Sequence, residues 1–151
     1  MQTFLPFADF ERSAKVLDKQ RLGKQRVEAW QILCVLTENK RAWANHPCTK
    51  MWRGFVPCLA LYGITICDEW IRRGCRDIMR SRFEPYLQGN TLSPIWLGYE
   101  PMHYAHRSRL VQKKESHYLP LFAGDPSCDF DATISKNHPN IFPLHILGDF
   151  E

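Results

Sequence analysis

The sequence predicts an all-α fold, a compact single domain of a few helices joined by long ordered loops. Apolar residues recur at helical spacing in several segments, and no segment shows the apolar–polar alternation typical of a strand. Ten prolines and only eight glycines favour short elements joined by ordered turns. With 151 residues and 44% apolar side chains, the chain is large enough to bury one core.

Two helices are expected in the first 40 residues. Residues 9–20 form the first, with Asp9 or Ser13 as its N-cap. Residues 21–38 form the second, which has an apolar stripe at helical spacing. The stripe consists of Leu22, Ala29, Leu33 and Leu36, with Val27, Trp30 and Cys34 beside it. Gly23 is unfavourable inside a helix, so it marks either a kink or the junction between the two.

Two further helices are expected beyond residue 56. Residues 57–74 form the clearest one, with Pro57 in its first turn and Gly74 at its exit. Its expected core face consists of Leu61, Ile64, Trp70 and Ile71. Residues 77–101 are rich in proline and glycine and predict a loop, and residues 102–114 predict a last helix. Four tryptophans are expected in the core, namely Trp43, Trp52, Trp70 and Trp96.

Charge divides the chain into two parts. Residues 1–124 carry 19 basic and 11 acidic side chains (+8), whereas residues 125–151 carry one and five (−4). We expect residues 1–124 to form the helical domain and residues 125–151 to be an acidic, irregular extension that packs on it or trails from it. A basic body is typical of proteins that bind phosphates.

Several classes of protein are disfavoured by the sequence. No apolar run approaches eighteen residues, and the first residues lack a signal-peptide pattern, so we expect a cytoplasmic protein that associates with the nucleoid when it acts. The six cysteines lack the spacing of a zinc site, and we expect free thiols. His103 and His106 could share a helical face as metal ligands but have no defined third ligand. We therefore expect neither a metal nor a cofactor.

A basic run ends in one carboxylate within the expected second helix. From Arg12 to Arg26 there are six Lys or Arg side chains against one acid, Asp18. Ion pairs within the helix can neutralise only a small part of this positive charge. The charge therefore indicates a polyanionic partner. Glu28 follows two residues later, one turn from Lys24. It forms either an ordinary surface pair with Lys24 or a general acid/base group beside an anionic substrate.

The order of several short motifs resembles a known family. In the first half they are Leu17-Asp18-Lys19-Gln20-Arg21-Leu22, Arg26-Val27-Glu28, Trp52-Arg53-Gly54, Leu61-Tyr62-Gly63, Glu69-Trp70 and Arg73-Gly74. In the second half they are Pro94-Ile95-Trp96-Leu97-Gly98, His103, His106-Arg107-Ser108, Leu110, Lys113, Tyr118 and Phe122. Over residues 1–122 the chain resembles the pyrimidine-dimer DNA glycosylases, the UV-specific endonucleases of T-even phage type, in their bacterial branch.

This resemblance implies an all-α fold and damaged double-stranded DNA as the partner, with crosslinked adjacent pyrimidines as the lesion. It also implies strand nicking after base loss. In the family's mechanism an N-terminal α-amine attacks C1′ of the damaged nucleotide, the base leaves, and a Schiff base forms before β-elimination. The glutamate that matches Glu28 assists at the sugar. An α-amine is less basic than a lysine amine, so more of it is unprotonated near neutrality.

The nucleophile is expected among Met1, Gln2 and Thr3. The phage enzyme exposes a threonine amine after its initiator methionine is removed, whereas a residue as large as Gln2 normally blocks that removal. The terminal amine then belongs to Met1, with Thr3 two residues further on. Two other positions depart from the phage pattern, because the arginine before the glutamate is Val27 here and the histidine before the leucine is Arg21.

Phosphate contacts are expected from both halves of the chain. The candidates are Arg12, Lys19, Arg21, Lys24, Arg26, His106, Arg107, Arg109, Lys113 and Lys114. Two alternatives to a lesion glycosylase stay open. One is an enzyme of the same scaffold that acts on a modified base or nucleotide without lyase activity. The other is a non-catalytic nucleic-acid-binding module, whose salt-dependent binding would be indifferent to Glu28. We expect a monomer.

Overall fold

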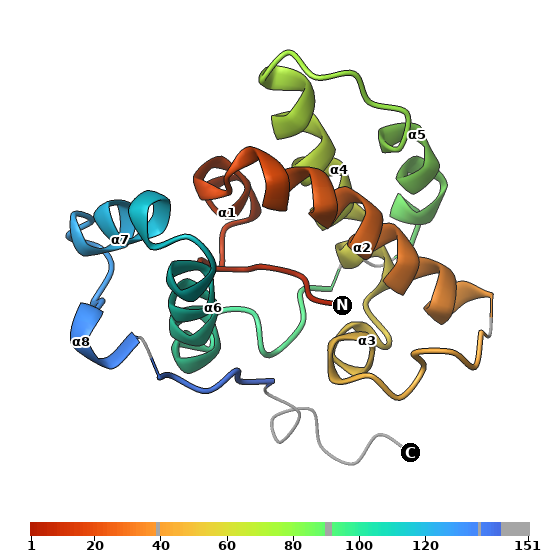
Figure 1. Ribbon diagram of the computed structural model, residues 1–151. Coiled ribbons are helices and arrows are strands. Elements are labelled where there is room, and N and C mark those ends of the chain that lie inside the picture. The colour runs from red at the N-terminus through yellow and green to blue at the C-terminus, as the bar shows by residue number, and fades with distance from the viewer. Residues whose placement is uncertain (39, 90–91, 136, 143–151) are drawn as a thin grey trace.

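The computed structural model describes residues 1–38, 40–89, 92–135 and 137–142 (Figure 1). All regular elements in these ranges are helices, which confirms the all-α prediction. They are α1 (Phe10–Val16), α2 (Lys19–Thr37), α3 (Pro47–Trp52), α4 (Val56–Arg72), α5 (Arg80–Phe83), the 3-10 helix η1 (Glu84–Leu87), α6 (Glu100–Lys113), α7 (Glu115–Ala123) and α8 (Ala132–Ser135).

The long helices α2 and α4 pack against each other and form the centre of the core. Gly23 lies inside α2 rather than at a junction, and a Cβ there would sit 3.0 Å from the Trp70 ring of α4. The glycine therefore permits the close approach of the two helices. The break between α1 and α2 falls at Leu17 and Asp18, where the backbone is extended. Asp9 caps α1, as expected, by accepting a hydrogen bond from the Arg12 amide.

Helices at four places were not expected from the sequence, and the first of them is α3 (Pro47–Trp52). The predicted loop 77–101 contains α5 and η1, with Pro85 in the first turn of η1. Glu115–Ala123 forms α7 with Pro120 inside it, although an internal proline normally indicates a helix end. The region after Gly124 was predicted to be irregular, but it includes α8. These elements are short or contain proline, so helical periodicity hardly registers in them.

The expected core face of α4 is partly wrong. Ile64 is buried, but Leu61 and Ile71 are 43% and 46% exposed. Most of α4 up to Cys67 is apolar on all sides, so its pattern does not indicate which side packs inward. The tryptophan prediction also holds only in part. Trp52 and Trp96 are fully buried, whereas Trp43 is 60% exposed.

An extended N-terminal segment, residues 1–6, runs between α2 and α6 (Figure 1). Thr3, Phe4 and Leu5 are buried in it. No strand accompanies this segment in the described part of the chain, so its backbone hydrogen bonds must come from elsewhere. That requirement shapes the site described next.

Candidate active site

Gln25 of α2 holds the first half of the N-terminal segment. Its side chain is buried, its oxygen accepts from the Phe4 amide at 2.8 Å, and its nitrogen donates to the Gln2 carbonyl at 3.0 Å. The buried Tyr62 hydroxyl donates to the same Gln25 oxygen at 2.7 Å and fixes the amide. One helical side chain thus supplies the hydrogen bonds that a neighbouring strand would otherwise provide.

Helix α6 holds the second half of the segment through three buried side chains, His103, His106 and Arg107, which we call the α6 clasp. His106 Nδ1 accepts from the Leu5 amide at 2.9 Å, and His103 Nδ1 lies 2.7 Å from the Leu5 carbonyl. Arg107 donates to the Pro6 carbonyl at 2.7 Å. The clasp therefore fixes the position of the chain's first residues.

The contacts of His106 determine where its proton lies. Because Nδ1 accepts from Leu5, the neutral imidazole carries its proton on Nε2. Burial, and then the charges of His103 and Arg107, lower the pKa of His106 to about 3, so the ring is neutral near pH 7. Nε2 lies 2.8 Å from the side-chain amide of Gln2. The structure has the side-chain nitrogen of Gln2 at this position, so the oxygen and nitrogen of the amide must exchange places for the oxygen to accept from Nε2.

Glu28 lies where this held segment meets α2. Its side chain is only 12% exposed, and Oε2 accepts a 2.9 Å hydrogen bond from the Gln2 backbone nitrogen. The other oxygen, Oε1, lies 3.6 Å from Lys24 Nζ, so the expected Lys24–Glu28 pair is present. Glu28 is thus more than a surface partner, because it also contacts the backbone next to Met1.

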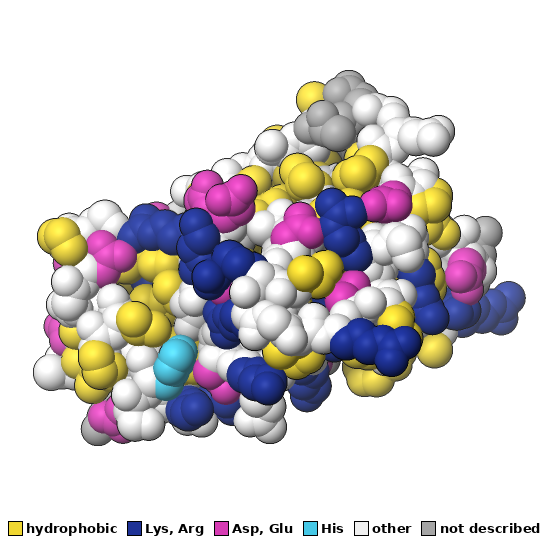
Figure 2. Space-filling model, turned by 90° about the horizontal axis from the view of Figure 1, so that it is seen from above, with side chains coloured by type: hydrophobic (Ala, Val, Ile, Leu, Met, Phe, Trp, Pro, Cys, Tyr) yellow, Lys and Arg dark blue, Asp and Glu magenta, His cyan; other side chains and the backbone are white. Residues whose placement is uncertain are grey.

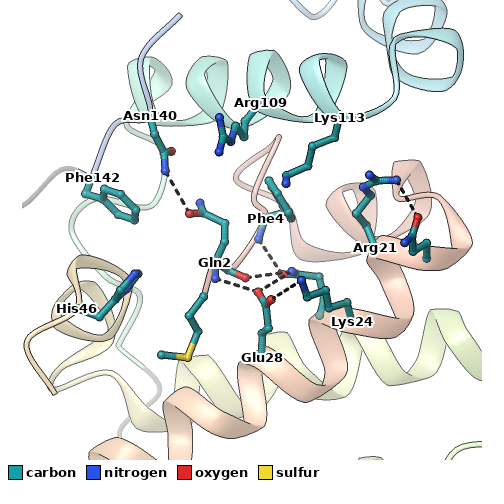
Figure 3. Close-up of a pocket in the computed structure, with 13 residues that line it drawn as sticks. Gln2, Phe4, Arg21, Lys24, Glu28, His46, Arg109, Lys113, Asn140 and Phe142 are labelled. Atoms are coloured by element: carbon teal, nitrogen blue, oxygen red, sulfur yellow. Dashed lines mark hydrogen bonds and ion pairs between the residues drawn. The ribbon is translucent and has the colours of Figure 1, made fainter. Parts of the chain in front are cut away.

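Around Glu28 is a cavity of about 370 Å³, which we call the basic cavity (Figure 3). Arg21 and Lys24 reach it from α2, and Arg109 and Lys113 reach it from α6. The N-terminal segment runs between these two helices, with Gln2 facing Glu28. Four cationic side chains from separate parts of the sequence therefore surround one carboxylate.

The cations of the basic cavity are close enough to affect one another. Burial, followed by the charges of Arg109, Arg21 and Lys24, lowers the pKa of Lys113, and Glu28 opposes this shift only in part. A bound phosphate would relieve this repulsion, because an anion stabilises the charged form of each group. The electrostatics of the cavity thus favour an anionic ligand.

His46 also lines the basic cavity, opposite the cations (Figure 3). Burial and then the positively charged α-amine of Met1 lower the pKa of His46, while Glu28 raises it. The α-amine, the imidazole and the carboxylate therefore lie within electrostatic range of one another. His46 Nδ1 also accepts from the Cys48 amide at 3.1 Å and so caps α3.

Several expected phosphate contacts lie elsewhere. Arg12 pairs with Asp125 and donates to Ser127 in the C-terminal extension. Arg26 pairs with Asp77, and its guanidinium lies 4.2 Å from the centre of the Trp70 ring. His106 and Arg107 belong to the α6 clasp and are buried.

Of the remaining expected contacts, Lys19 is exposed at the start of α2, and Lys114 lies 3.9 Å from Asp18. On the face shown in Figure 2, Lys and Arg side chains alternate with acidic and apolar ones. The surface charge on that face is mixed, in contrast to the concentration of cations in the basic cavity.

The three candidate nucleophile residues have different surroundings. Met1 lines the basic cavity, and the nitrogen of Gln2 contacts Glu28. Thr3 is fully buried, and its hydroxyl accepts a 3.0 Å hydrogen bond from Trp52 Nε1. Thr3 therefore anchors the segment to the core, and its hydroxyl does not reach the cavity.

Sequence reasoning did not identify several residues of the site. Gln25 appears in the sequence only as a neighbour of Glu28, and nothing in the pattern reveals that it serves the N-terminal segment. Asn140 and Phe142 of the extension also line the basic cavity, where Asn140 lies 3.4 Å from the Gln2 side chain. For His46 the sequence predicts a turn, with a catalytic role as the alternative.

Two further properties concern the described ranges alone. They contain no group of three or more His, Cys, Asp or Glu side chains that could hold a metal ion. None of their helices is long and apolar enough to cross a membrane. All six cysteines are free thiols, with Cys34, Cys48, Cys58 and Cys67 buried.

Comparison with known proteins gives one match. The family model for pyrimidine dimer DNA glycosylases matches residues 1–82, which carry Glu28, Arg21, Lys24 and the N-terminal segment. No curated protein and no solved structure matches the chain. The match covers more than half of the 151 residues. The chain therefore belongs to the pyrimidine dimer DNA glycosylase family.

Proposed function

We propose that this chain cleaves the bond from C1′ to one pyrimidine of a cyclobutane-dimer-type lesion in duplex DNA and then nicks the strand, with Glu28 and the α-amine of Met1 as its catalytic groups. The family supports the general role of a glycosylase on damaged DNA. One observation carries the finer proposal. The backbone nitrogen next to Met1 lies 2.9 Å from the Glu28 carboxylate, inside a cavity with four cationic side chains.

The basic cavity suits the sugar-phosphate backbone beside a lesion. Arg21, Lys24, Arg109 and Lys113 would contact phosphates, and their positions on two helices would fix the backbone in the cavity. Phosphate contacts position DNA but do not read its sequence. This fits an enzyme that recognises damage in any sequence context.

In the proposed reaction the unprotonated α-amine attacks C1′ of the damaged nucleotide. The bond from C1′ to the base breaks, and the base keeps the electron pair, takes up a proton and stays joined to the neighbouring pyrimidine through the cyclobutane ring. Loss of a proton from the attached nitrogen and opening of the sugar ring give a Schiff base. Removal of a C2′ proton then expels the 3′ phosphate and nicks the strand. Glu28 assists proton transfers at the sugar, where its low exposure keeps it close to the reacting atoms.

A hydrolytic version of the reaction is the second candidate. Glu28 Oε2 already accepts a hydrogen bond from the Gln2 backbone nitrogen. The other carboxylate oxygen can orient a water molecule that attacks C1′, and no Schiff base then forms. The two versions differ in one readout, because only the amine route gives a covalent adduct with borohydride.

Cleavage of the bond from C1′ to the base, which we call base release and which is read as strand breaks after alkali, tests the proposed function over a panel of UV-damaged and modified duplexes, with Glu28→Gln beside the wild type. We expect release from cyclobutane-dimer DNA, and a loss of about 10³-fold in Glu28→Gln. Affinity for the same duplex should stay or rise in the variant, because losing a negative charge does not weaken phosphate binding. Absence of base release and nicking on every damaged or modified duplex would refute the enzyme and leave a binding module.

A further inference from the structure

We infer that His46 is a further catalytic residue, which donates a hydrogen bond from Nε2 to the C2 carbonyl oxygen (O2) of the pyrimidine whose bond to C1′ breaks. This inference rests on the proposed function and adds a group that stabilises the departing base. The dimer stays intact in this step, because both pyrimidines remain joined through the cyclobutane ring. His46 lines the basic cavity together with Met1 and Glu28.

The fold makes His46 a hydrogen-bond donor. His46 is the N-cap of α3, where its Nδ1 accepts a 3.1 Å hydrogen bond from the Cys48 amide. A neutral imidazole that accepts at Nδ1 carries its proton on Nε2. Burial and then the positive charge of the Met1 α-amine lower the pKa of His46, and Glu28 opposes this shift, so the ring is neutral near pH 7. Nε2 is therefore a donor.

The imidazole is also held in place. Its ring centre lies 5.5 Å from that of Trp43 and 6.2 Å from that of Phe142, and both contacts are edge-to-face. The His46 amide donates to the Trp43 carbonyl at 3.0 Å. Within the part of the chain that the structure describes, Nδ1 has a hydrogen-bond partner and Nε2 has none. A fixed ring thus leaves one donor for a ligand in the cavity.

The backbone beside His46 is strained. Trp43 has a φ of 66°, which lies in the left-handed region that a bulky side chain rarely adopts. The hydrogen bond from the His46 amide to Trp43 lies within this strained turn. Such backbone is found most often at active sites and ligand-binding positions. The turn that presents His46 to the cavity therefore has a feature of a functional site.

The position of His46 in the basic cavity selects the group that it meets. The cations reach the cavity from α2 and α6, and His46 lies opposite them, across Gln2 (Figure 3). In a nucleotide, C1′ joins the sugar-phosphate backbone to the base. With C1′ at Glu28 and the phosphates among the cations, the base edge beside C1′ lies on the His46 side. The acceptor on that edge is O2, whose carbon is bonded directly to N1.

The lesion keeps this acceptor, and the reaction increases its negative charge. The cyclobutane ring saturates C5 and C6 of the pyrimidine and leaves the C2 carbonyl unchanged. As the amine bonds to C1′, the bond from C1′ to N1 breaks, and its electron pair goes to N1 and is shared with O2. A positioned donor at O2 stabilises this charge. His46 keeps its proton throughout, and N1 takes up a proton from solvent.

Two variants separate the donor from the N-cap of α3. In His46→Asn, the side-chain oxygen can still accept from the Cys48 amide, but the side chain is too short to replace Nε2. In His46→Gln, the amide nitrogen can reach the position of Nε2 and donate there, but glutamine is a poor N-cap. Two single-turnover rates are measured for each protein. They are base release from a cyclobutane-dimer duplex and nicking of a duplex with a preformed abasic site, which has no base to lose.

We expect His46→Asn to slow base release about 100-fold, the size typical of one lost donor to a developing charge. Nicking of the abasic duplex should change less than about twofold, because the lost interaction forms only as a base departs. His46→Gln should recover most of the rate of base release. Its thermal midpoint should fall by about 2–4 °C through the lost cap, whereas that of His46→Asn should equal the wild type.

Two results would overturn the inference. Equal base release by the wild type and His46→Asn would show that His46 only caps α3, and it would leave the proposed function intact. An equal loss of base release and abasic nicking would place His46 at the amine or the phosphates instead of the base. If the wild type releases base but nicks no abasic site, it takes the hydrolytic route, and base release by the two variants decides alone. If the wild type releases no base from any lesion, the proposed function fails, and this inference fails with it.

Discussion

Helices α2 and α6 carry similar sets of basic and polar side chains, but they use them in opposite ways. On α2, Arg21 and Lys24 face the basic cavity, whereas on α6 the residues His106 and Arg107 are buried against the N-terminal segment. Arg109, two residues further on, faces the cavity again. A basic residue on a helix can thus contact either a ligand or the chain itself. It contacts the chain itself where its face of the helix is buried, and it can contact a ligand where that face lines a cavity.

The largest effect expected from this comparison comes from His106→Leu. The variant leaves the buried Leu5 amide without its acceptor, which costs about 1–3 kcal/mol of unfolding free energy. It also releases the Gln2 side chain, so the residue next to Met1 loses one of the contacts that hold it at Glu28. We expect base release to fall about 100-fold or more, because small displacements of a nucleophile have effects of that size.

His106→Asn is the matched control, since its side-chain oxygen can accept from the Leu5 amide. It should recover part of both the stability and the rate. Chemical denaturation and single-turnover base release measure the two effects. Full activity in a folded His106→Leu protein would show that α6 does not position the nucleophile.

A second pair of variants separates the two uses of arginine on α6. Arg107→Met leaves the Pro6 carbonyl without its donor, so we expect a loss of about 2–3 kcal/mol in unfolding free energy. Arg109→Gln should change stability by less than about 0.5 kcal/mol, because this side chain is exposed. Its effect should appear in DNA binding, where the slope of log affinity against log salt falls by about 0.9.

Fluorescence anisotropy with an undamaged duplex, measured over a range of salt concentrations, gives these slopes. The slope for Arg107→Met should equal that of the wild type. If Arg107→Met lowers the slope and Arg109→Gln does not, the roles assigned to the two arginines are reversed.

A further effect is a pH dependence of stability from His106. Its pKa is about 3 in the folded protein and near 6.5 when unfolded, so between these values the unfolded chain binds a proton that the folded chain excludes. This contribution is complete above pH 6.5 and is lost as the pH falls. His106→Asn should reduce the slope of unfolding free energy against pH by about 1.4 kcal/mol per unit between pH 6 and 4.5. An unchanged slope would mean that His106 is accessible to solvent.

Features of the structure that depend on residues close in sequence could be predicted from the sequence. The Asp9 cap, the Gly74 exit and the Lys24–Glu28 pair depend on residues close in sequence, and all three are present. Leu61 and Ile71 were misplaced because α4 is apolar on nearly all sides. The periodicity of apolar residues in α4 therefore does not show which side of the helix is buried.

The α6 clasp could not be predicted for a different reason. His106 and Arg107 have the composition of a phosphate-binding surface, and only the folded chain reveals that an unpaired extended segment needs their hydrogen bonds. The same holds for Gln25, whose partners lie more than twenty residues away. Long-range satisfaction of backbone groups leaves no periodic pattern in the sequence.

Borohydride trapping on cyclobutane-dimer DNA, followed by tryptic mapping of the adduct, tests directly whether the α-amine is the nucleophile. Intact-mass spectrometry of the same preparation first establishes which residue carries the α-amine. We predict one covalent adduct, on the amine of the peptide that runs from Met1 to Arg12. Base release without an adduct would contradict the amine route and favour hydrolysis assisted by Glu28. An adduct on Lys24 or Lys113 would contradict the assignment of the nucleophile.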